Sequence, residues 1–290
     1  MKTFLLLIAV ALGIVFPQGQ VLSFLVQYGL MLLLVFAFLD LKIDKSIIKK
    51  EHFYILAANL IIPFVFYFSL KQFDSNLALA AFITALSPTA VAAPAVIHQL
   101  KGNVGFTAFS VLLTNFTTSM LVPFFLPVVI NADFNISVVS VLGPVIFVLS
   151  VPFIFVQIVK KFFKPFFIWL SSNREISYYL LVFNIYLASS KATHFIGVEY
   201  QGPKQIVYLI ALLGLIICAV NFYTGKILGG KEFGQEAMQS LGQKNNVLSV
   251  WIALTFINPL TALGPVFYIL YHNIFISFQL YRQSKAFKSL

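Results

Sequence analysis

Long apolar runs separated by short charged clusters make up most of the chain, as in residues 55–70, 136–159 and 205–220. Runs of about 20 apolar residues match the thickness of the hydrocarbon core of a bilayer. A backbone in lipid must form all its hydrogen bonds within helices or within a closed β-barrel. The runs lack the alternation of apolar and polar positions that marks a membrane β-barrel, so we expect helices. The pattern predicts an all-α polytopic membrane protein.

The positions of these runs predict ten transmembrane helices. We expect them near residues 3–17, 21–41, 52–70, 75–99, 103–130, 136–160, 175–195, 203–227, 233–257 and 259–281. The run 4–15 after Lys2 also resembles a signal peptide. No small-residue cleavage site follows that run, which favours a retained first helix over a cleaved one.

The distribution of lysine and arginine tests this count independently. With the N-terminus in the cytoplasm, Lys71, Lys191 and Lys204 fall outside, and Lys244 lies within the ninth segment. The other fifteen of the 19 basic residues fall inside: Lys2, Lys42, Lys45, Lys49, Lys50, Lys101, Lys160, Lys161, Lys164, Arg174, Lys226, Lys231, Arg282, Lys285 and Lys288. This positive-inside bias predicts an integral protein of a bacterial inner membrane with both termini cytoplasmic. It also explains the net charge of +10 without a nucleic-acid partner.

Two prolines interrupt the fourth predicted helix. The apolar run 77–86 meets Pro88 and Thr89, and Pro94 follows one and a half turns later. A proline removes a backbone hydrogen bond and clashes with the carbonyl of the preceding turn. We therefore expect the helix to open here, with a simple kink as the alternative.

A polar cluster interrupts the ninth predicted helix in the same way. Its members are Ser240, Gly242, Gln243, Lys244, Asn245 and Asn246. If residues 233–246 were a cytoplasmic loop instead, the remaining apolar stretch 247–281 would be long for one crossing and short for two. A ninth helix that begins near Phe233 and breaks around 242–246 avoids that conflict.

The two interruptions occupy equivalent places, because each lies in the fourth helix of a five-helix half. The chain is thus predicted to be a single transporter unit, 1–290, made of two inverted five-helix repeats, 1–130 and 136–281. In this arrangement helices four and nine are broken and crossed. Paired breaks of this kind indicate the binding site of a secondary transporter, because open backbone groups at bilayer depth need water, ions or solute to satisfy them.

The first interruption and the helix after it resemble the crossover region of the bile acid:sodium symporter family. The resemblance covers residues 85–94 (ALSPTAVAAP), 99–103 (QLKGN) and the hydroxyl-rich segment 107–123. In the second half, residues 240–246 (SLGQKNN) and 271–273 (YHN) resemble the second crossover helix and the final helix of that family.

This resemblance, to which Asn221 and Gly225 also contribute, implies a core domain that holds the crossed helices and a smaller panel domain. It further implies alternating access and transport of a small organic anion, commonly driven by sodium. The positions that bind sodium in the family read Ala93, Pro94, Thr107, Val111, Ser240 and Lys244 in this chain. Thr107 keeps one of the hydroxyls, but Ala93, Pro94 and Val111 bring no side-chain oxygen, and Ser240 stands where the family has a glutamate. The set lacks several of the oxygen ligands and the negative charge that sodium needs, so we do not favour sodium coupling, and we expect no metal or cofactor.

Lys244 suggests a replacement for sodium. An ionisable residue inside a membrane span is functional by default. Its ammonium would supply the missing positive charge, hold helices four and nine together, and either exchange a proton during the cycle or pair with an anionic substrate. The alternative is that Lys244 only reaches towards the cytoplasmic interface from a frayed helix start.

Further polar residues are expected around this site. Thr107, Ser110 and Thr114 share an i, i+3, i+7 face of the fifth helix. Gln243, Asn245 and Asn246 either line the site or hydrogen-bond between helices. Four more residues are expected behind these, in supporting positions: Asn115, Asn221, His272 and Asn273.

Other classes of protein fit the chain less well. No HExxH or GxSxG motif occurs, and the acidic residues fall at predicted helix ends or in loops, so we do not expect an enzyme. The single cysteine, Cys218, lies in an apolar run and excludes a disulfide framework. A channel, a receptor-like protein or a non-transporting membrane homologue is the alternative to a transporter whose partners are an organic anion and the lipid bilayer.

Overall fold

The computed structural model describes residues 2–39, 48–130 and 138–288. Lys42, Lys45 and the predicted start of the sixth helix at 136–137 lie outside the described residues. All regular elements of the described chain are helical. Their bounds are α1 Lys2–Val15, η1 Pro17–Leu22, α2 Leu25–Phe38, α3 Lys50–Leu70, α4 Ser75–Leu86, α5 Ala93–Gln99, α6 Val104–Val129, α7 Val138–Phe162, α8 Lys164–Ser172, α9 Glu175–His194, η4 Phe195–Glu199, α10 Ile206–Gly242, α11 Asn246–Phe256 and α12 Leu263–Lys288.

Five of these helices are long and apolar enough to cross a membrane: α3, α6, α7, α10 and residues 263–283 of α12. Segments of α1 and α2, together with α4 and α11, are apolar but shorter. The outer surface is apolar as well, since α7 exposes Phe147, Ile154 and Phe155. These features agree with the expected all-helical membrane protein.

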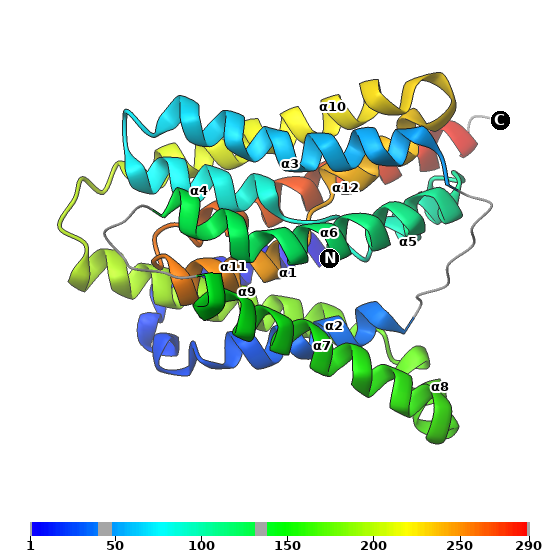
Figure 1. Cartoon of the computed structure of the whole chain (residues 1–290), viewed down its shortest axis with the longest axis horizontal. Helices are drawn as coiled ribbons and strands as arrows, with labels where there is room; N and C mark the ends of the chain where they lie inside the picture. The colour runs from blue at the N-terminus through cyan, green and yellow to red at the C-terminus, as the bar shows by residue number, and fades with distance from the viewer. Residues whose placement is uncertain (1, 40–47, 131–137, 289–290) are drawn as a thin grey trace.

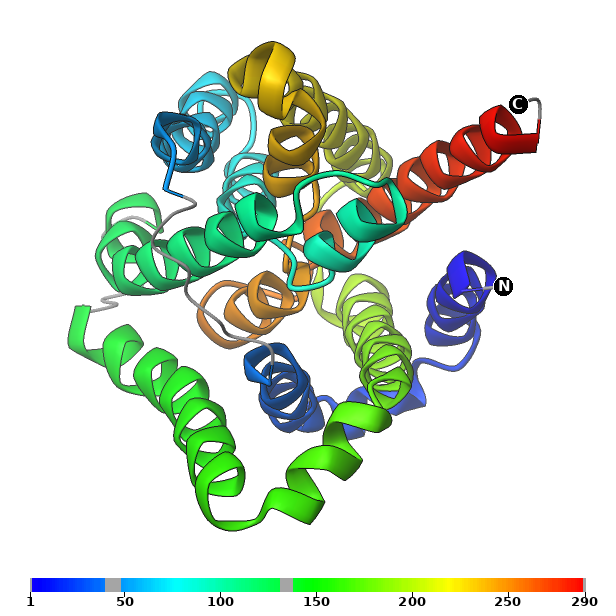
Figure 2. The same cartoon turned by 90° about the vertical axis from the view of Figure 1, so that its right-hand side faces the viewer.

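The helices lie side by side along one long axis and form two packing groups (Figure 1, Figure 2). In one group α9 packs against α1 and α2, and α2 also packs against α7. In the other, α10 packs against α3, α4 and α12. The helix α6 joins the groups, because it contacts both α3 and α7.

Two predicted helices meet in a tight hairpin inside α10. Gly230 has φ +60 and Phe233 is also non-helical, so the chain turns between two helical arms. A residue with a side chain is strained at a φ of this kind, whereas glycine is not. The arms pack closely, because a Cβ on Gly225 would lie 2.5 Å from the carbonyl oxygen of Ala237. The hairpin separates the predicted helices 203–227 and 233–257.

Some sequence-based boundaries were wrong. The first helix ends at Val15, and the 3₁₀ segment η1 follows it, because Pro17 begins a new turn. The stretch between the sixth and seventh predicted helices, expected as a loop, contains α8, which starts with Lys164 and Pro165. The last helix begins at Leu263, four residues later than expected, and continues to Lys288.

Both expected interruptions are present. The first lies between Leu86, the end of α4, and Ala93, the start of α5. The second lies between Gly242, the end of α10, and Asn246, the start of α11. A simple kink is therefore the wrong interpretation of the first, since residues 87–92 are not helical. Pro94 is the second residue of α5 and lies in its first turn, where a proline is well tolerated in a helix.

Candidate functional site

The two interruptions pair with each other through their backbones. The amide of Ala90 donates to the carbonyl of Gln243 at 2.8 Å, and the amide of Asn245 donates to the carbonyl of Pro88 at 2.7 Å. Thr89 and Lys244 thus face each other in an isolated antiparallel bridge. This corrects the expectation of bare main-chain groups, because unpaired amides and carbonyls are costly in an apolar interior and pairing removes that cost.

Side chains reinforce the contact between the interruptions. Thr89 Oγ1 donates to the carbonyl of Ser240 at 2.5 Å. Ser87 Oγ lies 2.6 Å from Ser249 Oγ and also donates to Asn246 Oδ1 at 2.6 Å. All five of these residues are buried. The two segments therefore form one hydrogen-bonded unit from residues more than 150 positions apart in sequence.

The helix α6 supports the first interruption. Thr114 Oγ1 accepts from the amide of Thr89 at 3.1 Å, and Asn115 Nδ2 donates to the carbonyl of Thr89 at 2.8 Å. Both backbone groups of Thr89 are thus satisfied by neighbouring side chains of one helix. Asn115, expected in a supporting position, contacts the interruption directly.

Lys244 is fully enclosed at the second interruption. Its side chain is 2% exposed, and Nζ donates a hydrogen bond to Asn59 Oδ1 of α3. Asn59 Nδ2 in turn donates to Thr118 Oγ1 at 3.1 Å. No acidic side chain of the described residues forms an ion pair with Lys244. The alternative in which Lys244 reaches an aqueous interface is therefore wrong.

The other predicted hydroxyls of α6 separate into different environments. Thr107, Ser110 and Thr114 are all buried, so they share an inward face as expected. Only Thr114 reaches the interruption. Ser110 Oγ is bonded to His52 Nδ1 at 2.8 Å, and Thr107 Oγ1 has no hydrogen-bond partner among the described residues.

The predicted residues on α10 and α12 meet behind the second interruption. Tyr268 donates its hydroxyl to the carbonyl of Gly242 at 2.8 Å and accepts from Asn221 Nδ2 at 3.2 Å. His272 packs edge-on against the Tyr268 ring. Asn273 Nδ2 donates to the carbonyl of Ile269, and the carbonyl of Asn273 accepts from Ser277 Oγ, so both of these bonds stay within α12. Asn221 and His272 therefore lie beside the site through Tyr268, and Asn273 shows no contact with it.

Gln243 begins a chain of amides that leads away from the site. Its Nε2 donates to Gln239 Oε1 at 2.6 Å, and Gln239 Nε2 donates to Gln279 Oε1 of α12 at 2.6 Å. A larger residue at the neighbouring Gly242 would collide with Phe222, whose ring lies 2.3 Å from the position of an added Cβ. The second interruption is thus held by amide hydrogen bonds at Gln243 and by close packing of Phe222 at Gly242.

Sequence reasoning missed five residues of the site: Asn59, Ser87, Thr118, Ser249 and Tyr268. Asn59 carried a usable signal, because it is an isolated amide in the apolar run 55–70. Ser87 precedes Pro88 directly and could also have been chosen. Tyr268 had no such signal, since the chain holds 12 tyrosines and nothing local distinguishes this one.

An apolar cavity of about 540 Å³ extends to the first interruption. Val91 of the interruption lines it together with Asn115 and Ser119 of α6. The remaining walls come mainly from α2 and α7 and include Phe38 and Phe153. This volume lies within the range of about 300–1,000 Å³ that is typical of small-molecule sites. Because its walls come from α2 and α7 on one side and from α6 and Val91 on the other, the cavity lies where the two packing groups of helices meet.

The residues at the family's sodium positions do not fit a sodium ion. Ala93, Pro94 and Val111 bring no side-chain oxygen, and the buried ammonium of Lys244 would repel a second cation. The described residues also contain no cluster of three or more His, Cys, Asp or Glu side chains that could hold a metal.

No protein-family model matches the chain, and no curated protein sequence matches it either.

Removing the acceptor of Lys244 should destabilise the protein. In Asn59→Leu the buried ammonium loses its partner, which costs about 1–3 kcal/mol, and we expect Tm to fall by at least about 2 °C. Thermal unfolding of the purified protein in detergent measures this. The double variant Asn59→Leu/Lys244→Met should recover most of the loss, because it leaves no buried charge without a partner, and Thr118 Oγ1 loses only a bond between neutral groups. Equal Tm values for the single variant and the unsubstituted protein would contradict the pairing.

Proposed function

We propose that this protein is a secondary transporter of a small organic anion, similar to the bile acid:sodium symporters but not coupled to sodium. The proposal includes ten membrane crossings, arranged as two inverted five-helix repeats. The observation that carries it is the pairing of two interrupted helices around a buried lysine. A buried ionisable group in a membrane span is costly and indicates function.

The inverted repeat is supported by matching elements in the two halves. Each half ends with an interrupted helix followed by a long helix, α4–α5 then α6 in the first, and the last arm of α10 with α11 then α12 in the second. The antiparallel pairing of Thr89 with Lys244 is the geometry that two inverted segments would adopt. In the proposed fold, α1, α2, α7 and α9 form the smaller domain.

The apolar cavity supports an amphiphilic solute. Phenylalanine and aliphatic side chains line most of it, which suits an apolar body. Asn115 lies in its wall and donates to the carbonyl of Thr89, the residue paired with Lys244. An anionic group placed at this end of the cavity would therefore be close to the only charge of the interruptions.

Lys244 takes the place of a bound cation in this proposal. It connects the second interruption to α3 through Asn59, as a coordinated ion would connect neighbouring segments. Transport would then be driven by proton exchange at Lys244 or by the solute gradient alone. A sodium gradient would contribute nothing in either case.

A thermal-shift screen tests this function. Purified protein is heated with a panel of organic anions in sodium buffer and in choline buffer, and a bound anion raises Tm by mass action. We expect a subset of amphiphilic anions to stabilise the protein equally in both buffers. Stabilisation that requires sodium would contradict the proposal that binding is independent of sodium. An absence of stabilisation by any anion would contradict the proposed transport of an organic anion.

A further inference from the structure

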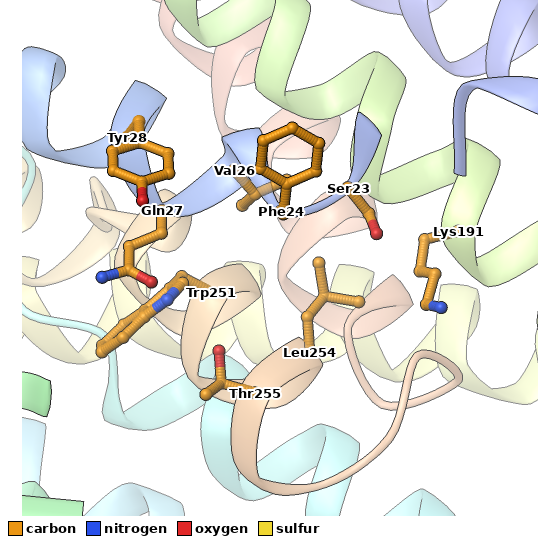
Figure 3. A pocket seen from close by; sticks show the side chains of 9 residues that line it. All are labelled: Ser23, Phe24, Val26, Gln27, Tyr28, Lys191, Trp251, Leu254 and Thr255. Carbon is orange, nitrogen blue, oxygen red and sulfur yellow. The ribbon is translucent and has the colours of Figure 1, made fainter. Parts of the chain in front are cut away.

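A second cavity, of about 370 Å³, lies at the opposite end of α2 from the apolar cavity. The start of α2 and the segment before it form one wall, and α9 and α11 form the others (Figure 3). Its lining residues are Ser23, Phe24, Val26, Gln27, Tyr28, Lys191, Trp251, Leu254 and Thr255. The charge pattern of the sequence predicts that this end of the molecule faces the exterior.

Polar groups distinguish this cavity from the apolar one. Ser23, Gln27 and Thr255 bring hydroxyl and amide groups, and Lys191 brings a positive charge. Figure 3 shows Lys191 at one side of the cavity and the Trp251 indole towards the other. The side chain of Lys191 forms no ion pair or hydrogen bond with the described residues. Its position in the last turn of α9 is favourable for a cation, but that does not account for the polar residues from other helices around it.

The two cavities are separated by packed side chains. Val26 and Leu30 of α2 are each 1% exposed and belong to the same apolar cluster as Trp251 and Leu248 of α11. Leu34, one turn beyond Leu30, already lines the apolar cavity. A solute in one cavity therefore cannot reach the other without movement of α2 against α11.

We propose that this second cavity is a binding site for a small organic monoanion, with its carboxylate at Lys191 and its apolar part against Trp251 and Leu254. The proposal deepens the proposed function and rests on it for the role of the site, which is to receive the solute on the external side. A carboxylate would gain a charge-assisted hydrogen bond from the ammonium. The hydroxyl of Ser23 lies towards Lys191 and would supply a further donor, whereas the amide of Gln27 lies beside the Trp251 indole (Figure 3).

Tryptophan fluorescence tests the site without any transport measurement. The chain has two tryptophans, and the other, Trp169 on α8, is 50% exposed. In a Trp169→Phe background, tryptophan emission comes from Trp251 alone. Trp251 is 3% exposed and lines the cavity, so a collisional quencher must reach it through the cavity. Iodide, an anionic quencher, should concentrate beside Lys191, whereas acrylamide is neutral. We expect Lys191→Gln to lower the iodide Stern–Volmer slope at least threefold and to leave the acrylamide slope unchanged, with Lys191→Arg restoring the iodide slope.

Two further arms make the test specific. Lys204→Gln removes an exposed lysine from the same end of the molecule and should leave iodide quenching unchanged. Cyclohexanecarboxylate, a small monoanion with an apolar ring, should protect Trp251 from iodide in the parent and not in Lys191→Gln. Equal iodide slopes in the Lys191→Gln and Lys204→Gln variants would overturn the proposal. If the quenching pattern holds but no anion is transported, the proposed function fails and the site does not.

Discussion

Replacing Lys244 by glutamine is expected to lower the initial rate of solute transport by about 100-fold, equivalent to about 2.7 kcal/mol. Glutamine keeps a hydrogen-bond donor, on a side chain shorter by one bond, but removes the charge that the two interruptions enclose. Hydrogen bonds that involve a charged group contribute about 1.5–3 kcal/mol each, so loss of the ammonium weakens both the link to Asn59 and the attraction for an anion. Uptake into proteoliposomes measures the rate.

Lys226→Gln is the matched control for this variant. Lys226 lies on α10, is exposed, and packs beside Gly234 near the hairpin turn and not at the interruption. We expect it to transport at the parental rate, so that a general effect of lost positive charge is excluded. If Lys244→Gln and Lys226→Gln both retain the parental rate, Lys244 has no part in transport and the proposed replacement of sodium is wrong.

Filling the apolar cavity with Ser119→Trp should lower transport at least as strongly as the change at Lys244, while the protein stays folded. Ser119 is 8% exposed and lines the cavity of about 540 Å³ at its α6 wall. An indole at this position would fill the part of the cavity in which the proposed function places the solute. Overpacking costs about 1–3 kcal/mol where no space exists, so a cavity of this size should keep the loss of stability small.

Val128→Trp is the control for the added bulk. Val128 lies on the same helix, is 70% exposed, and does not line the cavity. Paired measurements of uptake and of Tm separate the two effects. We expect both variants to show Tm values close to the parent, with transport lost only in Ser119→Trp. Normal uptake by Ser119→Trp would show that the solute does not pass through this cavity.

The interruptions were predictable because their causes are local. Pro88 removes a backbone donor and disfavours the helical conformation of the residue before it, which favours an end of α4 near Leu86. The polar run at Gly242 and Lys244 interrupts the apolar pattern of its span. The partners of these residues were not predictable in the same way. Asn59 and Tyr268 contact the second interruption only because α3 and α12 turn particular faces towards it, and helix spacing alone does not fix that rotation.

The wrong expectations have physical causes as well. Unpaired backbone groups were expected at the interruptions. Instead, the amide of Ala90 pairs with the carbonyl of Gln243, and the amide of Asn245 pairs with the carbonyl of Pro88, so these groups need no side-chain partner. The helix α8 was missed because lysines precede it and Arg174 follows it, a pattern that also marks a loop between spans. In both cases a tertiary arrangement decided between two outcomes that the local pattern allowed equally.

Counterflow in proteoliposomes tests most directly whether the paired interruptions belong to a carrier. Vesicles loaded with an unlabelled anion chosen from the thermal-shift screen are diluted into medium that contains a trace of the same anion in labelled form, with choline as the only cation. Because a carrier exposes its site alternately to the two sides, we expect the label to accumulate transiently above its external concentration. A label that only equilibrates, with no overshoot in choline or in sodium, would contradict the account.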